Sequence, residues 1–137
     1  MTENLHNHSH GAVSETVLLV EDEPVVREVV SVMLAEGGYC VVSARDGAGA
    51  LAVLEERGAE RVDVVVTDVV MPRMGGAQLA EALSERYPSV RVLYTSGYAN
   101  DARVRRGLLA SAPFLAKPFS ADALRGKLRE VLDGARL

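Results

Sequence analysis

Five short runs of apolar residues, separated by segments with helical periodicity, constrain this chain more than any other feature of its sequence. The runs span residues 16–20, 39–43, 62–67, 90–94 and 113–116, and the helical segments span 24–36, 47–57, 76–86, 99–109 and 121–133. Runs such as VLLV and VDVVVT lack polar alternation, which is typical of parallel strands buried on both faces. Strand and helix alternating five times predict a doubly wound, five-stranded parallel α/β fold with right-handed crossovers.

Start and stop signals support the helical segments. Pro24 suits the first turn of a helix, and the pair Gly37 and Gly38 suits the end of the same helix. Asp46 and Ser120 each stand directly before a helical segment, where a short polar side chain can cap the free N–H groups. We therefore expect helices to begin after these residues.

The length and composition predict one ordinary globular domain. The 137 residues are 48% hydrophobic and 25% charged, with a net charge of −4, which is enough for one packed core. Residues 1–15 are polar, have no period and contain three alternating histidines, so we expect a flexible leader followed by a domain over residues 16–137.

Several classes of function are disfavoured by the composition. The sequence pI of about 5.4 comes without a clustered basic stripe, so we expect no direct binding to nucleic acid. No apolar run approaches the length of a membrane span, and the first residues lack the layout of a signal peptide. We therefore expect a cytoplasmic protein that does not engage a membrane.

Polar residues gather at the ends of the expected strands. Glu21 and Asp22 follow the first strand, Asp68 follows the third, Ser96 the fourth and Lys117 the fifth. In a doubly wound sheet the ligand site lies at the carboxyl ends of the strands. Three carboxylates meeting there indicate either a bound cation or a shared proton. Because the ligands are all oxygens, Mg²⁺ is the cation that we expect.

Four motifs at these positions resemble one family. VLLVEDEP, VVVTDVVMPRMGG, VLYTSG and FLAKPF, in this order and at these intervals, resemble the receiver domain of bacterial response regulators and hybrid histidine kinases. The resemblance covers roughly residues 16–134. It implies the (βα)5 flavodoxin-like fold of receivers, with strand order 2-1-3-4-5, and the transfer of a phosphoryl group from a phosphohistidine.

The resemblance also implies a role for each acidic residue. Asp68 matches the phosphoacceptor and is also a metal ligand. Asp22 matches a direct Mg²⁺ ligand, Glu21 a ligand that acts mostly through water, and the backbone carbonyl of Val70 the remaining protein ligand. Glu21 stands where aspartate is more frequent in the family, which shifts a water-mediated contact by one methylene.

Further roles concern the phosphoryl group and the response to it. Ser96 matches the hydroxyl that binds the phosphoryl group and takes part in the switch. Lys117 matches the lysine that pairs with the phosphoryl group. Phe114 matches the aromatic switch residue, which is often tyrosine, so its signal must pass through packing alone. Pro118 matches a proline preceded by a cis peptide bond.

The resemblance implies a histidine kinase or a histidine phosphotransfer domain as partner, together with a weak homodimer on phosphorylation. On a helical wheel Val26, Val29, Val30, Met33 and Leu34 form a core-facing arc. Val25 and Val32 fall together on its flank, where they would either grip this partner or merely widen the core stripe.

Two residues should control the lifetime of the phosphorylated state. Val70 and Tyr98 lie two positions beyond the acceptor and the hydroxyl, and neither side chain is suited to orient an attacking water. We expect slow hydrolysis, unless Tyr98 points outwards instead. We expect that the protein is not an enzyme that turns over an external substrate, because it catalyses only its own phosphorylation and dephosphorylation.

Three other functions compete with this interpretation. A Mg²⁺-dependent phosphohydrolase with an aspartyl nucleophile would need an acid two residues beyond the nucleophile after the first strand, a pattern that EDEP does not supply. A flavin-binding module would need a Ser/Thr/Gly-rich loop there. A receiver-like module that is never phosphorylated would not need the complete site. Both a stand-alone regulator and the receiver of a hybrid kinase agree with the sequence.

Overall fold

The computed structural model describes residues 15–69, 74, 76–96 and 112–134. Its five strands are β1 (Thr16–Val20), β2 (Cys40–Ala44), β3 (Val64–Asp68), β4 (Arg91–Ser96) and β5 (Phe114–Ala116). Within the described ranges the helices are α2 (Pro24–Glu36), α3 (Gly47–Arg57), α4 (Gly76–Arg86) and α6 (Ala121–Gly134), with a 3-10 turn η1 (Ala59–Arg61). The leader and the helix expected at 99–109 lie outside the described residues.

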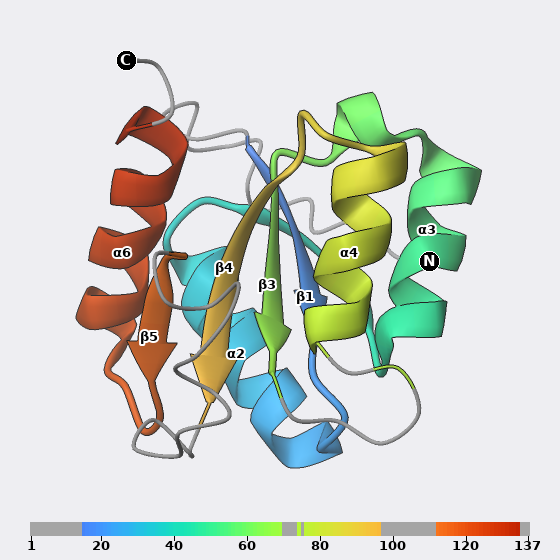
Figure 1. Ribbon diagram of the computed structural model, residues 1–137. Helices are drawn as coiled ribbons and strands as arrows, with labels where there is room; N and C mark the ends of the chain where they lie inside the picture. The colour runs from blue at the N-terminus through green and yellow to red at the C-terminus, as the bar shows by residue number, and fades with distance from the viewer. Residues whose placement is uncertain (1–14, 70–73, 75, 97–111, 135–137) are drawn as a thin grey trace.

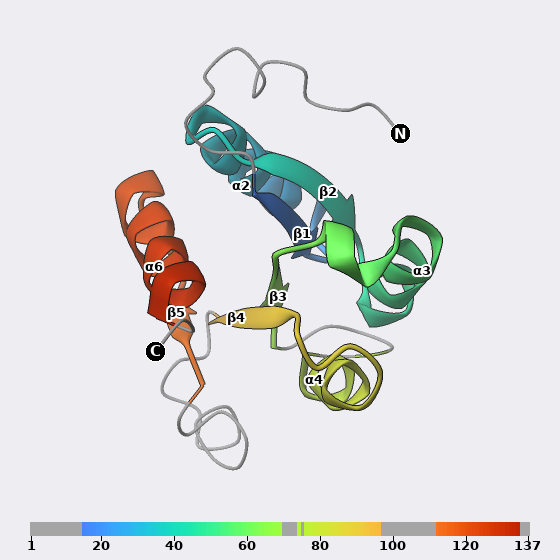
Figure 2. The same ribbon diagram turned by 90° about the horizontal axis from the view of Figure 1, so that it is seen from above.

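The strands form one parallel sheet in the order β2-β1-β3-β4-β5, which confirms the predicted fold and strand order. Helices α2 and α6 cover one face of this sheet, and α3 and α4 cover the other (Figures 1 and 2). The central strands β1 and β3 are buried almost throughout, whereas the edge strands β2 and β5 are only partly buried. This pattern explains why the central runs carry no polar alternation.

Local signals fix the helix starts. The Asp46 side chain accepts a hydrogen bond of 2.8 Å from the Gly49 N–H, and the Ser120 hydroxyl accepts one of 3.0 Å from the Ala123 N–H. Both residues therefore act as the caps that the sequence predicts. At the end of α2, Gly38 has a φ of 97°, a left-handed conformation that only glycine adopts at little cost.

Helix α2 is anchored by a neighbour at its carboxyl end. The helix has no basic residue in its last turn, and the Arg125 guanidinium of α6 supplies the missing cation. Its Nε and Nη2 atoms donate hydrogen bonds of 3.1 and 2.9 Å to the Met33 carbonyl. This contact satisfies a carbonyl near the helix end and fastens α2 to α6.

The core-facing side of α2 differs from the prediction at one residue. Val30 and Leu34 are buried, and Val26 and Met33 pack partly against the same core, as expected. Val29 is 48% exposed, so its assignment to the core-facing arc is wrong. The sheet meets the helix along the side of Val30 and Leu34, and this leaves Val29 at the rim of the arc.

Candidate functional site

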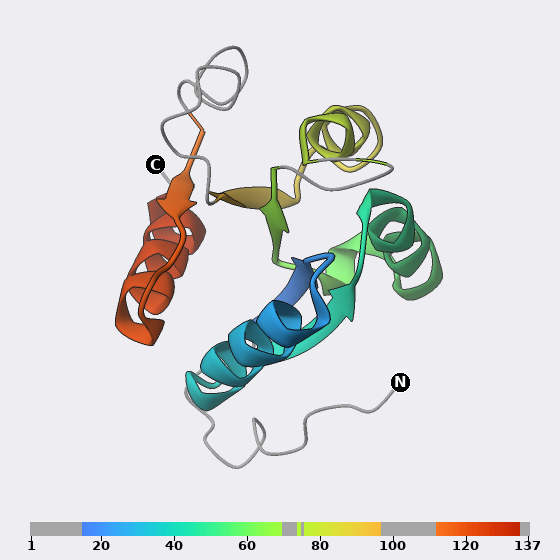
Figure 3. The ribbon, with the colours of Figure 1, turned by 90° about the horizontal axis from the view of Figure 1, so that it is seen from below.

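The carboxyl ends of the strands lie at one edge of the sheet, the lower edge in Figure 1, which Figure 3 shows from below. Glu21 directly follows β1, Asp68 ends β3, Ser96 ends β4 and Lys117 follows β5. Asp68 is in register with Thr95, the neighbour of Ser96 on β4. The parallel topology therefore brings together side chains that are 96 residues apart in the sequence.

Three carboxylates form the centre of the site. Glu21, Asp22 and Asp68 each offer an oxygen, and these oxygens all lie within 4.8 Å of one another. Glu21 is 2% exposed and Asp68 8%, while Asp22 is half-buried. Charges so close together and so poorly hydrated repel one another, and the site therefore needs positive charge.

Lys117 supplies part of that charge. Its Nζ atom donates hydrogen bonds of 2.8 Å to Glu21 Oε1 and 3.0 Å to Asp68 Oδ2. Burial by itself would lower the pKa of the Lys117 ammonium, but its hydrogen bonds and charge attraction to Glu21 and Asp68 outweigh burial and raise it. The lysine is therefore held charged at neutral pH.

One lysine does not balance the cluster. Burial raises the pKa of the Glu21 carboxyl, and the charge of Asp68 raises it further, against the opposing effects of Lys117 and of the Glu23 N–H. That N–H donates a hydrogen bond of 3.3 Å to Glu21 Oε2. Three carboxylates face one ammonium here, so the ionised site carries excess negative charge.

The donor set fits a hard divalent cation. Carboxylate oxygens are the preferred protein ligands of Mg²⁺, which keeps its remaining positions for water or phosphate oxygens. Glu21, Asp22 and Asp68 present such oxygens from two neighbouring strand ends, and the half-buried Asp22 leaves the cluster open to solvent. Val70, expected to add a backbone carbonyl, lies outside the described residues.

Sequence reasoning missed one contact at this edge. The Arg27 side chain of α2 donates a hydrogen bond of 2.7 Å from Nη1 to the backbone carbonyl of Glu21. That carbonyl belongs to the peptide that joins Glu21 to Asp22, so Arg27 fixes the backbone between two carboxylates. The only sequence signal is an arginine six residues after Glu21, a spacing that is too common to be informative.

The remaining expected residues surround the acidic cluster. Ser96 is fully buried at the end of β4, and Phe114 begins the edge strand β5, where it is half-buried. The peptide bond between Lys117 and Pro118 is cis, the geometry that the resemblance implies for it. Tyr98, expected near the phosphoryl group, lies outside the described residues.

An apolar surface lies next to this edge. Val25 is 76% exposed and Val32 49%, and the structure adds Val29 between them as a third member of the stripe. A hollow beside the stripe is lined by Val25, Val29, Met33, Pro118 and Phe119, and also by Lys117. The hollow is therefore bordered both by two valines of the stripe and by the lysine that contacts the acidic cluster.

Comparison with known proteins identifies the family. The model of the response regulator receiver domain matches residues 17–129, so the chain belongs to the family of two-component receiver domains. Receivers generally serve as phosphoacceptors that bind Mg²⁺ and interact with histidine kinases or phosphotransfer proteins. No described helix is both long and apolar enough to cross a membrane.

Individual relatives agree with this assignment. The chain is 46% identical over 122 residues to the sensor kinase CckA of Brucella abortus, covering 88% of this chain and 13% of the kinase. Chemotaxis protein CheY4 of Vibrio cholerae superposes with a TM-score of 0.77 at 32% identity, covering 88% of this chain and all of the other. The receiver domain from hybrid histidine kinase CckA superposes with a TM-score of 0.71 at 31% identity. This match covers 86% of this chain and 99% of the other. The chain spans less than half the length of the curated relatives that it matches.

Proposed function

We propose that Asp68 accepts a phosphoryl group from the phosphohistidine of a histidine kinase or histidine phosphotransfer domain. The observation that carries this proposal is the pair of hydrogen bonds from Lys117 to Glu21 and Asp68, with Asp22 in the same cluster. This arrangement places a partly buried carboxylate beside a fixed ammonium and an oxygen-rich cation site. Membership of the receiver family supports the same role.

The residues divide the chemistry among them. A carboxylate oxygen of Asp68 forms a bond to phosphorus as the bond from phosphorus to the histidine nitrogen breaks, and the nitrogen keeps the electron pair and takes up a proton. Lys117 and the Ser96 hydroxyl are proposed to stabilise the charge on the phosphoryl oxygens. Bound at Glu21, Asp22 and Asp68, Mg²⁺ would neutralise charge on the same oxygens. The product is an acyl phosphate on Asp68.

The apolar stripe of Val25, Val29 and Val32 is proposed to receive the partner. Exposed apolar side chains of this size on a helix are costly unless another surface covers them. The hollow beside them borders Lys117, so a helix lying on the stripe would hold its phosphohistidine near Asp68. The wide-core alternative is disfavoured for these residues, because all three are 48% exposed or more.

Two biological settings are compatible with this site. The similar proteins include a sensor kinase and a chemotaxis protein that this chain covers over its whole length, and either setting suits a receiver that passes its signal on through partner binding or onward transfer. We propose a cytoplasmic receiver, without turnover of an external substrate, that responds to phosphorylation through Ser96 and Phe114. A weak homodimer on phosphorylation remains part of this proposal.

Labelling with acetyl phosphate and Mg²⁺ tests the acceptor. Wild-type protein should gain one phosphoryl group, detected by intact mass, and Asp68→Asn should gain none because the nucleophilic oxygen is lost. Asp122→Asn is the matched control, since Asp122 is an exposed carboxylate in the first turn of α6. Undiminished labelling of Asp68→Asn, or steady turnover of a small phosphoester by the wild type, would contradict the proposal.

A further inference from the structure

Tyr94 and Phe114 form an aromatic pair across two neighbouring strands. They are direct partners in the register of β4 and β5, so their side chains leave the same face of the sheet side by side. The Tyr94 N–H donates a hydrogen bond of 3.0 Å to the Pro113 carbonyl, which fixes this register next to Phe114. Phe114 packs against Tyr94 in the small apolar cluster that surrounds the tyrosine.

The two rings differ in their freedom to move. Tyr94 is 3% exposed and is enclosed by Val69, Ala80 and Val92, which come from three different parts of the fold. Phe114 is half-buried and begins a three-residue strand at the edge of the sheet. Displacing Tyr94 would therefore disturb packing on several sides, whereas Phe114 is less buried and belongs to a short strand.

Tyr94 also lies beside the phosphoryl-binding end of its strand. Ser96 is two residues further along β4, so both side chains point to the same face of the sheet. Ser96 is in register with Ala116, as Tyr94 is with Phe114. Tyr94 is therefore the buried side chain that neighbours both residues on this face, Phe114 across the strands and Ser96 along β4.

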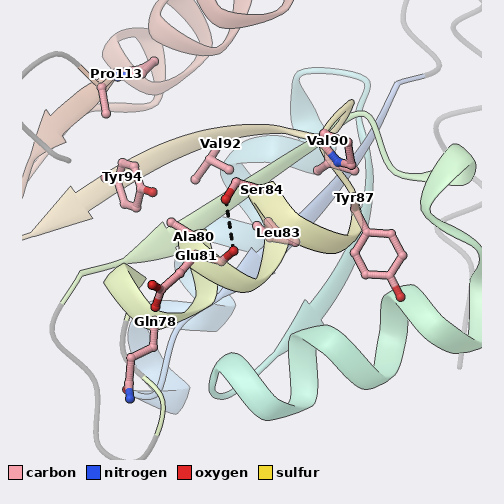
Figure 4. A pocket seen from close by; sticks show the side chains of 12 residues that line it. Gln78, Ala80, Glu81, Leu83, Ser84, Tyr87, Val90, Val92, Tyr94 and Pro113 are labelled. Atoms are coloured by element: carbon pink, nitrogen blue, oxygen red, sulfur yellow. Dashed lines mark hydrogen bonds between the residues drawn. The ribbon is translucent and has the colours of Figure 1, made fainter.

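The environment of the ring is apolar. Tyr94 lies at one end of a pocket between α4 and β4, beside Val92 and Pro113, and Tyr87 lies at the far end (Figure 4). Burial raises the pKa of the Tyr94 hydroxyl to about 12, so the side chain stays neutral at physiological pH. Its contribution to the cluster is the packing surface of an uncharged ring.

We infer that Tyr94 is the positioning residue of the switch: its fixed ring is the surface against which Phe114 packs and moves when Ser96 engages the phosphoryl group. This inference rests on the proposed function, because it uses the roles of Ser96 and Phe114. It assigns a role to a residue that lies within the motif VLYTSG but to which the resemblance gives none. It also gives a physical route for a switch that has no hydroxyl. Contact between two rings replaces the missing hydrogen bond.

Fluorine NMR offers a direct test, since the chain contains only two phenylalanines, Phe114 and Phe119. Protein labelled with fluorophenylalanine should give two resonances, assigned by Phe119→Leu. Addition of beryllofluoride and Mg²⁺, which mimic the phosphoryl group, should move the Phe114 resonance. Shifts are measured against an external fluorine standard, because Phe119 packs on the other face of the sheet but also lines the hollow beside Lys117.

Three variants separate the ring from its surroundings. Tyr94→Met fills similar space without a flat ring and should lose at least half of the Phe114 displacement, while acetyl phosphate still labels Asp68 within about threefold of wild type. Tyr94→Phe keeps the ring and should retain the full displacement. Tyr87→Met is the matched control, since Tyr87 lines the same pocket but packs in a different cluster from Phe114.

Each outcome decides the inference. Full displacement in Tyr94→Met would overturn it, and so would an equal loss in Tyr94→Phe and Tyr94→Met, which would assign the effect to the hydroxyl. A wild-type Phe114 resonance that does not respond would overturn the inference together with the proposed switch, while labelling of Asp68 would still report on the acceptor separately. Because Tyr94→Phe preserves the packing, the comparison stands even if the methionine variant is less stable.

Discussion

The two ends of strand β1 each carry a glutamate, and the two glutamates have opposite electrostatics. Glu15 precedes the strand and accepts a hydrogen bond of 2.9 Å from Arg129, which lowers the pKa of its carboxyl. Glu21 follows the strand, and burial raises the pKa of its carboxyl in spite of Lys117. Five residues of β1 thus separate a carboxylate that is stabilised in its charged form from one that is not.

This difference distinguishes structural from functional charge. At the amino end of the sheet, Arg129 also donates to Asp133, and the Asp63 carboxylate accepts a hydrogen bond of 2.8 Å from the Thr16 N–H. These carboxylates stabilise the fold as they are. At the carboxyl end the carboxylates outnumber the cations near them, and a divalent ion can supply the missing positive charge.

The largest effect should come from adding that ion. With a dissociation constant of about 1 mM, 10 mM Mg²⁺ should stabilise the wild type by about 1.4 kcal/mol, a rise of about 4 °C in Tm. Asp22→Ala should abolish the rise, because it removes a ligand. Glu15→Gln, at the other end of β1, should keep it. Thermal denaturation measures the Tm. If Mg²⁺ did not raise the Tm of the wild type, the proposed electrostatic difference between the two ends of β1 would be wrong.

A second experiment tests the surface next to the carboxyl end. Val25→Glu with Val32→Glu should slow transfer from a phosphohistidine partner about fivefold, roughly 1 kcal/mol in barrier, because charges replace apolar contact area. Labelling by acetyl phosphate should be unchanged, since it needs no docking. Rates are measured by rapid quench with both donors.

The matched control for docking carries the same added charge on the other face of the sheet. Ala52 and Ser84 are exposed on α3 and α4, and the double variant Ala52→Glu, Ser84→Glu should transfer at the wild-type rate. Equal slowing in the control would attribute the effect to net charge, and equal loss with both donors would indicate damage to the fold.

The smallest effect should be a pair of opposite pH dependences in metal-free protein. The pKa of Glu15 is lowered, so its stabilisation is present above the unfolded-state value of 4.5 and is lost as the pH falls through the folded-state value. Glu15→Gln should therefore cost about 0.5 kcal/mol at pH 7 and nothing in acid. Urea denaturation at several pH values measures this difference.

Glu21 should show the reverse sign. Because its pKa is raised, stability is greatest below 4.5 and declines as the pH rises through the folded-state value. Glu21→Gln, which mimics the protonated form, should gain stability relative to the wild type between pH 4.5 and 7. If both variants showed pH dependences of the same sign, the proposed contrast between the two ends would be wrong.

The sequence predicted the helices better than the strands. The bounds of α2, α3 and α4 agree with the predicted segments, because periodicity and capping residues such as Asp46 mark both ends. The predicted starts and ends of β2, β3 and β4 differ from the structure by one or two residues. Strands buried on both faces have no alternation to fix their limits, and only the register with neighbouring strands decides them.

The site was predicted as a set of residues rather than as a geometry. Motif positions identified Glu21, Asp22, Asp68 and Lys117, because parallel topology brings successive strand ends to one edge. The bridge that Lys117 makes between two carboxylates depends on side-chain reach, which spacing does not encode. The misplacement of Val29 has a similar cause, since a helical wheel gives angles around a helix but not the direction from which the sheet approaches.

Helix α2 is fastened at both ends, by Arg27 to the Glu21 carbonyl and by Arg125 to the Met33 carbonyl. A partner that docks on its valines would meet a helix that is already fixed in place, and would lose little of its binding free energy to ordering it. Pre-organisation of this kind lets a small apolar stripe suffice for a brief encounter, in which the two proteins must separate again once the phosphoryl group has passed.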